Sequence, residues 1–309
     1  MRHLLSLADL DQGTVRYLVD RAVRFAEPRQ RGLPLADRVV GIYFRRSSTR
    51  TRSAFQAGAL RLGASTVFYG PDDLQVNTGE TWGDTIRVMS GYLDALVLRT
   101  NDSMGELREI ADASGIPVVN ALTRDEHPTQ AIGDLATLRE HFGELSGRRI
   151  LYVGEGNSSA AALAMAVAAH PGLELTLVTP EGFGLPPHIL DKLEKLDGAD
   201  RIEERHNIRR LPRDMDAVYA TRWQTMGVSH DAQDWLAAFD GFKVTRAMLS
   251  QVARGSGEEP VFLHDLPAMR GQDVDDDVLD GATSLAWRQA YHKMTSAMAV
   301  LEWSVSGIA

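Results

Sequence analysis

Short apolar runs alternate with longer amphipathic stretches along most of the chain. In the first half, four runs rich in β-branched residues each precede a polar loop and a helix-like pattern, at 38–44, 65–70, 95–99 and 117–121. The alternation starts again in the second half, with runs at 148–154, 174–179, 216–221 and 260–267. Alternation of this kind is typical of parallel sheets whose connecting helices cover the faces. The pattern therefore predicts an α/β fold with two domains, each a parallel sheet flanked by helices.

Two further segments have apolar residues at helical spacing. Residues 127–145 lie between the two halves, and their pattern predicts a helix that bridges them. Residues 284–303 show the same spacing with no strand after them, so this helix could pack on either domain. A chain of 309 residues also exceeds the length at which one core usually stops growing. We expect a first domain at 1–139, a second domain at 140–285 and a C-terminal helix at 286–309.

Composition and charge narrow the class of partner. The formal net charge of −9 argues against binding to nucleic acid or to an anionic membrane, because both need a broad positive field. The chain has no cysteine, which excludes disulfides and thiolate catalysis. No segment approaches the roughly 20 apolar residues that span a bilayer, and the first residues do not resemble a signal peptide. We expect a soluble cytoplasmic protein.

The segment FRRSSTRTRSAF, residues 44–55, gathers arginines among hydroxyl side chains directly after a predicted strand. In open α/β sheets, ligands bind beyond the carboxyl ends of the strands, where helix N-termini expose N–H groups. The guanidinium of Arg50 offers a fork that fits a phosphate, and the serines and threonines beside it supply hydroxyl donors. The segment lacks the glycines and lysine of a P-loop. A capped helix with a solvated basic face is the alternative interpretation.

Polar groups of the same kind occur at the end of another predicted strand and at the start of another predicted helix. Arg99 ends the apolar run 95–99, and His127 and Gln130 lie three residues apart at the start of a helix. Each alone is compatible with a surface charge or a helix cap. Together with the arginine-rich segment they form a mixture of cations and neutral donors, which suits a substrate that has both a phosphate and a carbonyl.

Four segments, FRRSSTRTRSAF, ALVLR, DEHPTQAIGDL and LHDLP, resemble in order and spacing the signatures of the aspartate/ornithine carbamoyltransferase family. The resemblance implies that the first domain binds carbamoyl phosphate and the second binds the amine acceptor. It also implies a homotrimer with active sites at subunit interfaces, a final helix packed on the first domain, and direct transfer between two small molecules without metal or cofactor. The residues matched to phosphate binding are Ser48, Thr49, Arg50 and Thr51. Those matched to the carbamoyl group are Arg99, His127 and Gln130, with Thr51, Arg99 and His127 as donors to the growing oxyanion.

The acceptor motifs are mixed. T-R-x-Q, with Arg222 and Gln224, is similar to the aspartate enzymes, whereas the W-x-x-M-G that overlaps it is similar to the ornithine enzymes. Thr221 stands where the ornithine pattern has an Asp, and Thr225 stands where it has a Ser. Asp265 replaces the Cys of the ornithine pattern and the Pro of the aspartate pattern. The acceptor-binding residues implied by the resemblance are Asn157, Arg222, Gln224, Asp265 and Leu266.

Two cationic positions of the aspartate pattern are also absent, since Thr78 and Ala160 stand in their places. We therefore expect a short diamino acid as acceptor in a specialised or secondary pathway, with Arg222 on its carboxylate and Asp265 on its spare ammonium. An ordinary ornithine or aspartate enzyme is the alternative, and a non-catalytic family paralogue is a further one. The segment VGEGNSS lacks the full G-x-G-x-x-G fingerprint, and no dinucleotide is expected.

Overall fold

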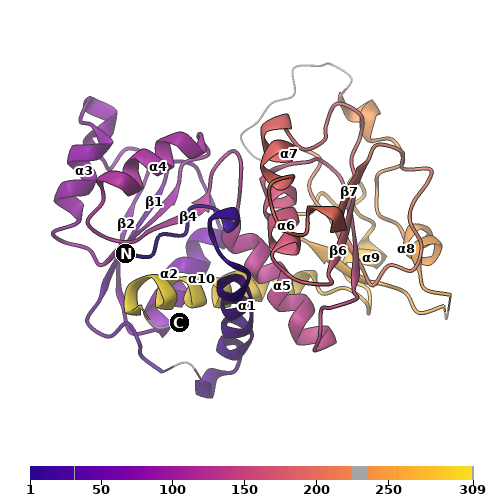
Figure 1. The fold of residues 1–309 in the computed structure, drawn as a ribbon, viewed down its shortest axis with the longest axis horizontal. Coiled ribbons are helices and arrows are strands. Elements are labelled where there is room, and N and C mark those ends of the chain that lie inside the picture. Colours follow the sequence, from indigo (N-terminus) through magenta and orange to yellow (C-terminus); the bar gives the residue numbers. More distant parts are fainter. Residues whose placement is uncertain (31, 225–234, 256, 308–309) are drawn as a thin grey trace. The chain divides into compact units, whose positions relative to one another are not determined.

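The computed structural model describes residues 1–30, 32–224, 235–255 and 257–307, which form two compact units (Figure 1). Unit 1 comprises residues 1–140 and 291–309, and unit 2 comprises residues 141–290. Each unit is built around its own parallel sheet with helices packed on it. The predicted fold class is therefore confirmed.

The sheet of unit 1 has four parallel strands in the order β2–β1–β3–β4. The strands are β1 (Val39–Phe44), β2 (Ser65–Tyr69), β3 (Ala95–Arg99) and β4 (Val118–Leu122). The strands β3 and β4 are buried along their whole length, which explains why their sequences are mostly apolar rather than alternating. The polar exceptions are Arg99 at the end of β3 and Asn120 in β4.

Helices connect and cover these strands. They are α1 (Gln12–Ala26), α2 (Arg50–Arg61), α3 (Trp82–Met89) and α4 (Met104–Ala113), with short 3-10 helices at Leu7–Asp9, Pro28–Gln30 and Gln75–Thr78. Phe44 of β1 pairs with Arg99 of β3, and the N–H of Arg45 donates to the carbonyl of Arg99 at 2.9 Å. This register places the segment that leads into α2 beside the end of β3.

The sheet of unit 2 has five parallel strands in the order β7–β6–β5–β8–β9. The strands are β5 (Arg149–Val153), β6 (Glu174–Val178), β7 (Ile202–Arg205), β8 (Ala217–Ala220) and β9 (Val261–His264). The helices are α6 (Ser158–Ala168), α7 (Pro187–Leu193), α8 (Arg246–Val252) and α9 (Asp276–Leu279), with 3-10 helices at Ala199–Arg201 and Trp235–Phe239. The edge strand β7 was not predicted, because its four residues are mostly charged and only partly buried.

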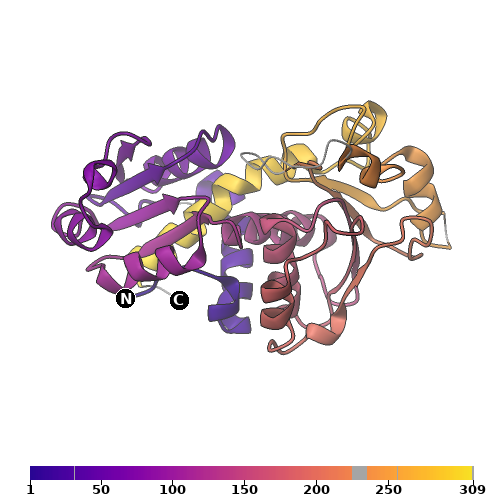
Figure 2. The same ribbon diagram turned by 90° about the horizontal axis from the view of Figure 1, so that it is seen from above.

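Two helices have residues in both units: α5 (Pro128–Phe142) and α10 (Ala286–Ser306). Figure 2 shows α10 in yellow as one continuous helix. Within unit 1, α10 packs on α5 at Gly133, where an added Cβ would lie 3.2 Å from the carbonyl oxygen of His292. The same helix is held to α1 by a bidentate ion pair between Arg21 and Glu302, at 2.6 and 2.7 Å. None of the helices in the described part of the chain has the length and apolarity of a membrane span.

Candidate active site

Arg99 is a cation buried at the carboxyl end of β3. Its side chain is only 4% exposed, and its Nη1 donates to the hydroxyls of Ser48 at 3.3 Å and Thr51 at 3.4 Å. Among the described residues no carboxylate pairs with it, and its Nε has no hydrogen-bond partner. Burial and then the charge of Arg50 lower the pKa of Arg99 to about 10, so the group stays protonated at neutral pH. A buried cation that faces only hydroxyls is stabilised when an anion binds beside it.

The hydroxyls near Arg99 are not used to cap α2. Thr49 occupies the N-cap position with helical backbone angles, and its side chain makes no capping hydrogen bond. Ser48 and Thr51 are buried and face Arg99, whereas Thr49 is exposed and Arg50 is half-buried. The structure thus brings Ser48, Thr51 and Arg99 together, with Arg50 close enough to act on Arg99 electrostatically. This arrangement differs from the capped helix considered as the alternative.

His127 lies directly before α5 and is almost fully buried. Burial, followed by the positive charges of Lys293 and Arg99, holds its pKa well below the usual value. The imidazole is therefore neutral at neutral pH, with one nitrogen able to donate a hydrogen bond and the other able to accept one. The hydroxyl of Thr129 lies 3.5 Å from its Nδ1.

Gln130 is the third residue of α5 and is buried, and its amide contacts two charged side chains. Its Nε2 donates to Oδ1 of Asp134 at 2.7 Å, and the Nζ of Lys293 on α10 donates to its Oε1. We call Ser48, Thr51, Arg99, His127 and Gln130 the unit 1 site. Sequence reasoning did not find Asp134 or Lys293. A signal for Lys293 exists, since it is a cation on the apolar side of a long helix, but its partner is 163 residues away.

In unit 2, polar side chains meet where β5, β8 and β9 end. Asn157 caps α6, and its Oδ1 accepts the N–H groups of Ser159 at 2.9 Å and Ala160 at 3.2 Å. These two N–H groups are thus occupied by a protein oxygen. The Nδ2 of the same Asn157 donates to the hydroxyl of Thr221 at 3.1 Å.

The carboxylate of Asp265 completes this network. It accepts hydrogen bonds from the hydroxyls of Ser159 at 2.9 Å and Thr221 at 3.2 Å. Ala220 and His264 are paired in the parallel register of β8 and β9, so the residues that follow them, Thr221 and Asp265, lie side by side. We call Asn157, Ser159, Thr221 and Asp265 the unit 2 site. Its one carboxylate is held by neutral donors and keeps 15% of its side-chain surface exposed.

A buried pair stands behind Asp265. The Nε2 of His264 lies 2.8 Å from Oδ2 of Asp273, and Nδ1 of His264 accepts the N–H of Leu266 at 2.9 Å. Because Nδ1 accepts, the ring proton is on Nε2 and is donated to Asp273. Leu266 has a φ of 53°, a conformation that is uncommon for a branched residue. His264 and Asp273 therefore hold the 265–266 turn, and neither residue was identified from the sequence.

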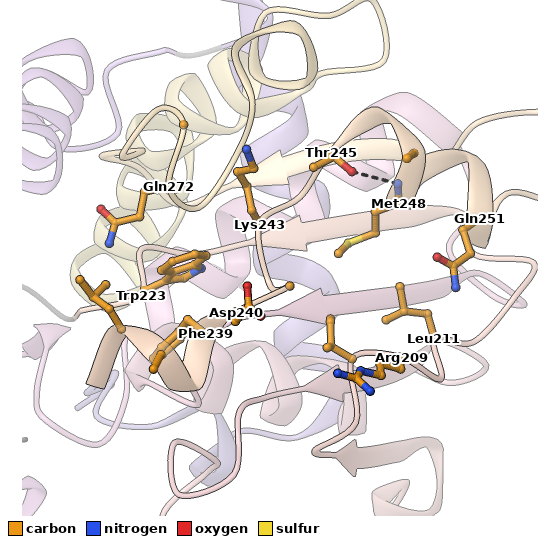
Figure 3. Close-up of a pocket in the computed structure, with 16 residues that line it drawn as sticks. Arg209, Leu211, Trp223, Phe239, Asp240, Lys243, Thr245, Met248, Gln251 and Gln272 are labelled. Atoms are coloured by element: carbon orange, nitrogen blue, oxygen red, sulfur yellow. Dashed lines mark hydrogen bonds between the residues drawn. The ribbon is translucent and has the colours of Figure 1, made fainter. Parts of the chain in front are cut away.

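Arg222 and Gln224 are half-buried, and within the described residues neither side chain hydrogen-bonds to the unit 2 site. Their segment is anchored by Trp223, whose ring stacks on Phe239 with centroids 5.1 Å apart. Figure 3 shows these two rings facing one another. Both rings line a hollow of about 1210 Å³. Asn157, Thr221 and Asp265 do not line this hollow, so its size does not mark it as the site. Thr225 lies outside the described residues.

Among the described residues no group of three or more His, Asp or Glu side chains could hold a metal ion. The unit 1 site instead offers cations and neutral donors. Such a set can bind an anion and stabilise negative charge that develops on a carbonyl oxygen. The unit 2 site offers one carboxylate and several hydroxyl and amide groups, a set that can receive an ammonium.

Comparison with known proteins identifies relatives over nearly the whole chain. Residues 2–140 match the carbamoyl-P binding domain of aspartate/ornithine carbamoyltransferases, and residues 146–304 match the Asp/Orn binding domain. An ornithine carbamoyltransferase of Caldicellulosiruptor saccharolyticus is 36% identical over 306 residues, 97% of each chain. One of Methanothermobacter thermautotrophicus is 34% identical over 310 residues and covers all of both chains.

Solved structures give the same result. The ornithine carbamoyltransferase of Pyrococcus furiosus superposes with a TM-score of 0.90 at 30% identity, covering 100% of this chain and 98% of that one. The enzyme of Gloeobacter violaceus superposes with a TM-score of 0.84 at 32% identity, covering 99% of each chain.

Proposed function

The chain belongs to the aspartate/ornithine carbamoyltransferase family and is a carbamoyl phosphate-dependent carbamoyltransferase, and from this premise we propose that its acceptor is a diamino acid, with ornithine as the first candidate. The full-length relatives are named ornithine carbamoyltransferase, which favours the ornithine alternative over the non-standard acceptor expected from the mixed motifs. The observation that carries the proposal is the carboxylate of Asp265, held in place by the hydroxyls of Ser159 and Thr221.

In this proposal the unit 1 site binds carbamoyl phosphate. Ser48, Thr49, Arg50 and Thr51 hold the phosphate, and Gln130 orients the carbamoyl amide. Arg99, His127 and Thr51 donate to the carbonyl oxygen, where negative charge grows as the amine attacks. The burial of Arg99 and His127 supports this role, because donors in a site of low dielectric stabilise such charge more than donors in water.

In this reaction no group of the enzyme forms a covalent bond to either substrate. The uncharged amine nitrogen bonds to the carbonyl carbon, the bond from that carbon to the phosphate oxygen breaks, and the departing phosphate takes the amine proton. Holding the two reactants in attack geometry supplies much of the rate enhancement.

Asp265 supports a cationic group on the acceptor. An ammonium that replaces solvent beside this carboxylate gains a charge-assisted hydrogen bond, whereas the second carboxylate of aspartate would be repelled there. Thr78 and Ala160 supply no cation to offset that repulsion. In the proposal, Arg222 and Gln224 receive the acceptor's carboxylate, and Asn157 and Leu266 complete the acceptor site.

A diamino acid shorter than ornithine is the second candidate, in a specialised pathway. It is favoured by one specific difference, because the carboxylate stands at the end of β9 as Asp265 and the end of β8 carries Thr221. Moving the charge from one strand end to its neighbour changes the distance between the recognised ammonium and the reacting amine.

By family resemblance we also propose that the protein is a homotrimer and that it works in the cytoplasm. Light scattering of the purified protein tests the first proposal, and cell fractionation tests the second.

The deciding experiment incubates the enzyme with carbamoyl phosphate and one acceptor at a time: ornithine, diaminobutyrate, diaminopropionate or aspartate. Phosphate release and the mass of the ureido product are both measured. A diamino acid with the highest kcat/KM supports the proposal, and its chain length separates the two candidates. Preference for aspartate overturns the acceptor assignment, and no product with any amine points to a non-catalytic paralogue.

A further inference from the structure

Lys293 is a buried ammonium that the reaction outlined above does not use. It is 9% exposed, although it belongs to the residue type that is least often buried. Its Nζ donates to the side-chain oxygen of Gln130, whose nitrogen donates to Asp134 at 2.7 Å. Gln130 and Asp134 are themselves 1% and 0% exposed. A neutral amide is therefore bracketed by a buried cation and a buried anion.

The two charged groups determine which way the amide of Gln130 points. An ammonium only donates hydrogen bonds and a carboxylate only accepts them, so the oxygen must face Lys293 and the nitrogen must face Asp134. The reversed amide would set its N–H₂ against the ammonium and its oxygen against the carboxylate. Both contacts would then be repulsive in a buried environment.

The backbones on which these side chains stand are tightly packed. Gly133 lets α10 approach α5 closely, and the hydroxyl of Ser296 donates to the carbonyl of Thr129 at 3.0 Å. The ammonium of Lys293 thus reaches Gln130 from a fixed base. Lys293 is also one of the charges that lower the pKa of His127, which places it near His127 as well as Gln130.

We infer that Lys293 and Asp134 are positioning residues that lock the amide of Gln130 in one orientation for the carbamoyl group. This inference rests on the proposed function, in which Gln130 orients that group. The oxygen of Gln130 has two lone pairs, and with one engaged by Lys293 the other remains for the N–H₂ of the carbamoyl group. A rotated amide would present a donor to a donor, and the carbonyl carbon would leave its attack geometry.

The test compares Lys293→Met, which keeps the length of the stem, with Lys293→Arg, which keeps the charge and the donor. Removing one partner of such a contact should lower kcat with carbamoyl phosphate about 10- to 100-fold in Lys293→Met, while Lys293→Arg stays within about 5-fold of wild type. Binding of inorganic phosphate, measured calorimetrically, should change little in either variant, because the groups proposed to hold phosphate are untouched. Lys195→Met, at an exposed lysine of unit 2, is the matched control.

A double-mutant cycle with Gln130→Leu separates this inference from the proposed function. If Lys293 acts through Gln130, Lys293→Met should lower kcat less than about 3-fold when Gln130→Leu is already present. If Lys293→Met lowers kcat as much in the Gln130→Leu variant as in wild type, the inference about Lys293 is wrong, but the proposed carbamoyl transfer is unaffected. If Lys293→Met does not fold, Lys293→Arg tests the inference instead. A folded Lys293→Arg variant whose kcat falls more than about 100-fold would contradict the proposed positioning of Gln130 by Lys293. Failure of the wild type to transfer a carbamoyl group would instead overturn the proposed function.

Discussion

Arg50 is the half-buried arginine whose charge lowers the pKa of Arg99. We predict that Arg50→Ala weakens carbamoyl phosphate binding about 10- to 150-fold, the usual effect of losing a charge-assisted hydrogen bond. Calorimetric titration of carbamoyl phosphate measures the change. Arg52→Ala is the control, because Arg52 is exposed on the same helix and lies over the ring of Phe68. Equal affinity in Arg50→Ala and wild type would remove Arg50 from the phosphate site.

His127 is expected to act mainly on the transition state. A donor that engages growing charge stabilises the transition state more than the bound substrate, so His127→Ala should lower kcat about 10²- to 10³-fold. Steady-state kinetics with saturating acceptor measure the effect. If only the KM for carbamoyl phosphate rises, His127 binds the substrate and does not stabilise the oxyanion.

The low pKa of His127 also predicts how stability depends on pH. Its pKa in the folded protein lies well below the unfolded value of about 6.5, so between these values the unfolded chain binds a proton that the folded chain does not. The free energy of unfolding should therefore fall as pH decreases below about 6.5. Denaturant titrations between pH 5 and 7 should show a shallower decline for His127→Gln than for wild type. Parallel curves would contradict a depressed pKa.

Asp265 carries the prediction about the acceptor. Asp265→Asn keeps the shape of the side chain and removes its charge, so kcat/KM for the preferred diamino acid should fall at least about 10-fold with little change for carbamoyl phosphate. Adding Thr221→Asp restores a carboxylate at the end of β8 and should raise the activity with ornithine relative to shorter diamino acids. An unchanged ranking of acceptors in both variants would exclude Asp265 as the ammonium receptor.

At the scale of elements, the contact between α5 and α10 depends on the missing side chain of Gly133. A methyl group there would lie 3.2 Å from a helix carbonyl oxygen, so Gly133→Ala should destabilise the protein by about 1–3 kcal/mol despite its better helix propensity. Gly105→Ala in α4 is the control, because its nearest neighbour would be an ordinary 3.6 Å away. Chemical denaturation measures both. A stabilised Gly133→Ala would show that α10 can move aside without penalty.

Elements with a strong apolar pattern were predictable and the others were not. The runs at 95–99 and 117–121 correspond to β3 and β4 within one residue, because strands buried on both faces are mostly apolar. The segment of β7 reads as a charged loop, since an edge strand needs little apolar surface. The meeting of Ser48, Thr51 and Arg99 follows from the rule that parallel strands end at one edge.

Other parts of the site had no local signal. Lys293 reaches Gln130, and His264 pairs with Asp273, through contacts that only the folded chain brings about. The predicted clamp of Arg222 and Asp265 stays a prediction, because within the described residues Asp265 hydrogen-bonds to Thr221 and Ser159 whereas Arg222 does not join them. Strand ends can be inferred from apolar runs, but side-chain partners across helices cannot.

At the scale of the whole molecule, unit 1 is built from both ends of the chain. Its α10 portion packs on α5 at Gly133 and on α2 at Gly58, and Glu302 pairs with Arg21 of α1. We predict that a fragment of residues 1–140 does not fold alone, because the faces that α10 covers would be exposed to water. Circular dichroism and hydrogen exchange should show native-like order only after a peptide of residues 286–307 is added. Cooperative unfolding of 1–140 alone would contradict this.

This arrangement of unit 1 has a consequence for synthesis on the ribosome. Residues 1–140 emerge before unit 2, whereas the part of α10 that carries Lys293 is translated after it. At about 5–20 residues per second, synthesis of the 150 residues between the two parts of unit 1 takes roughly 8 to 30 seconds. During that interval we expect the surface of α5 that α10 covers to be exposed to water and to chaperones. A nascent chain that stalls before residue 293 also lacks the ammonium beside Gln130, so the proposed fixing of the Gln130 amide cannot yet form.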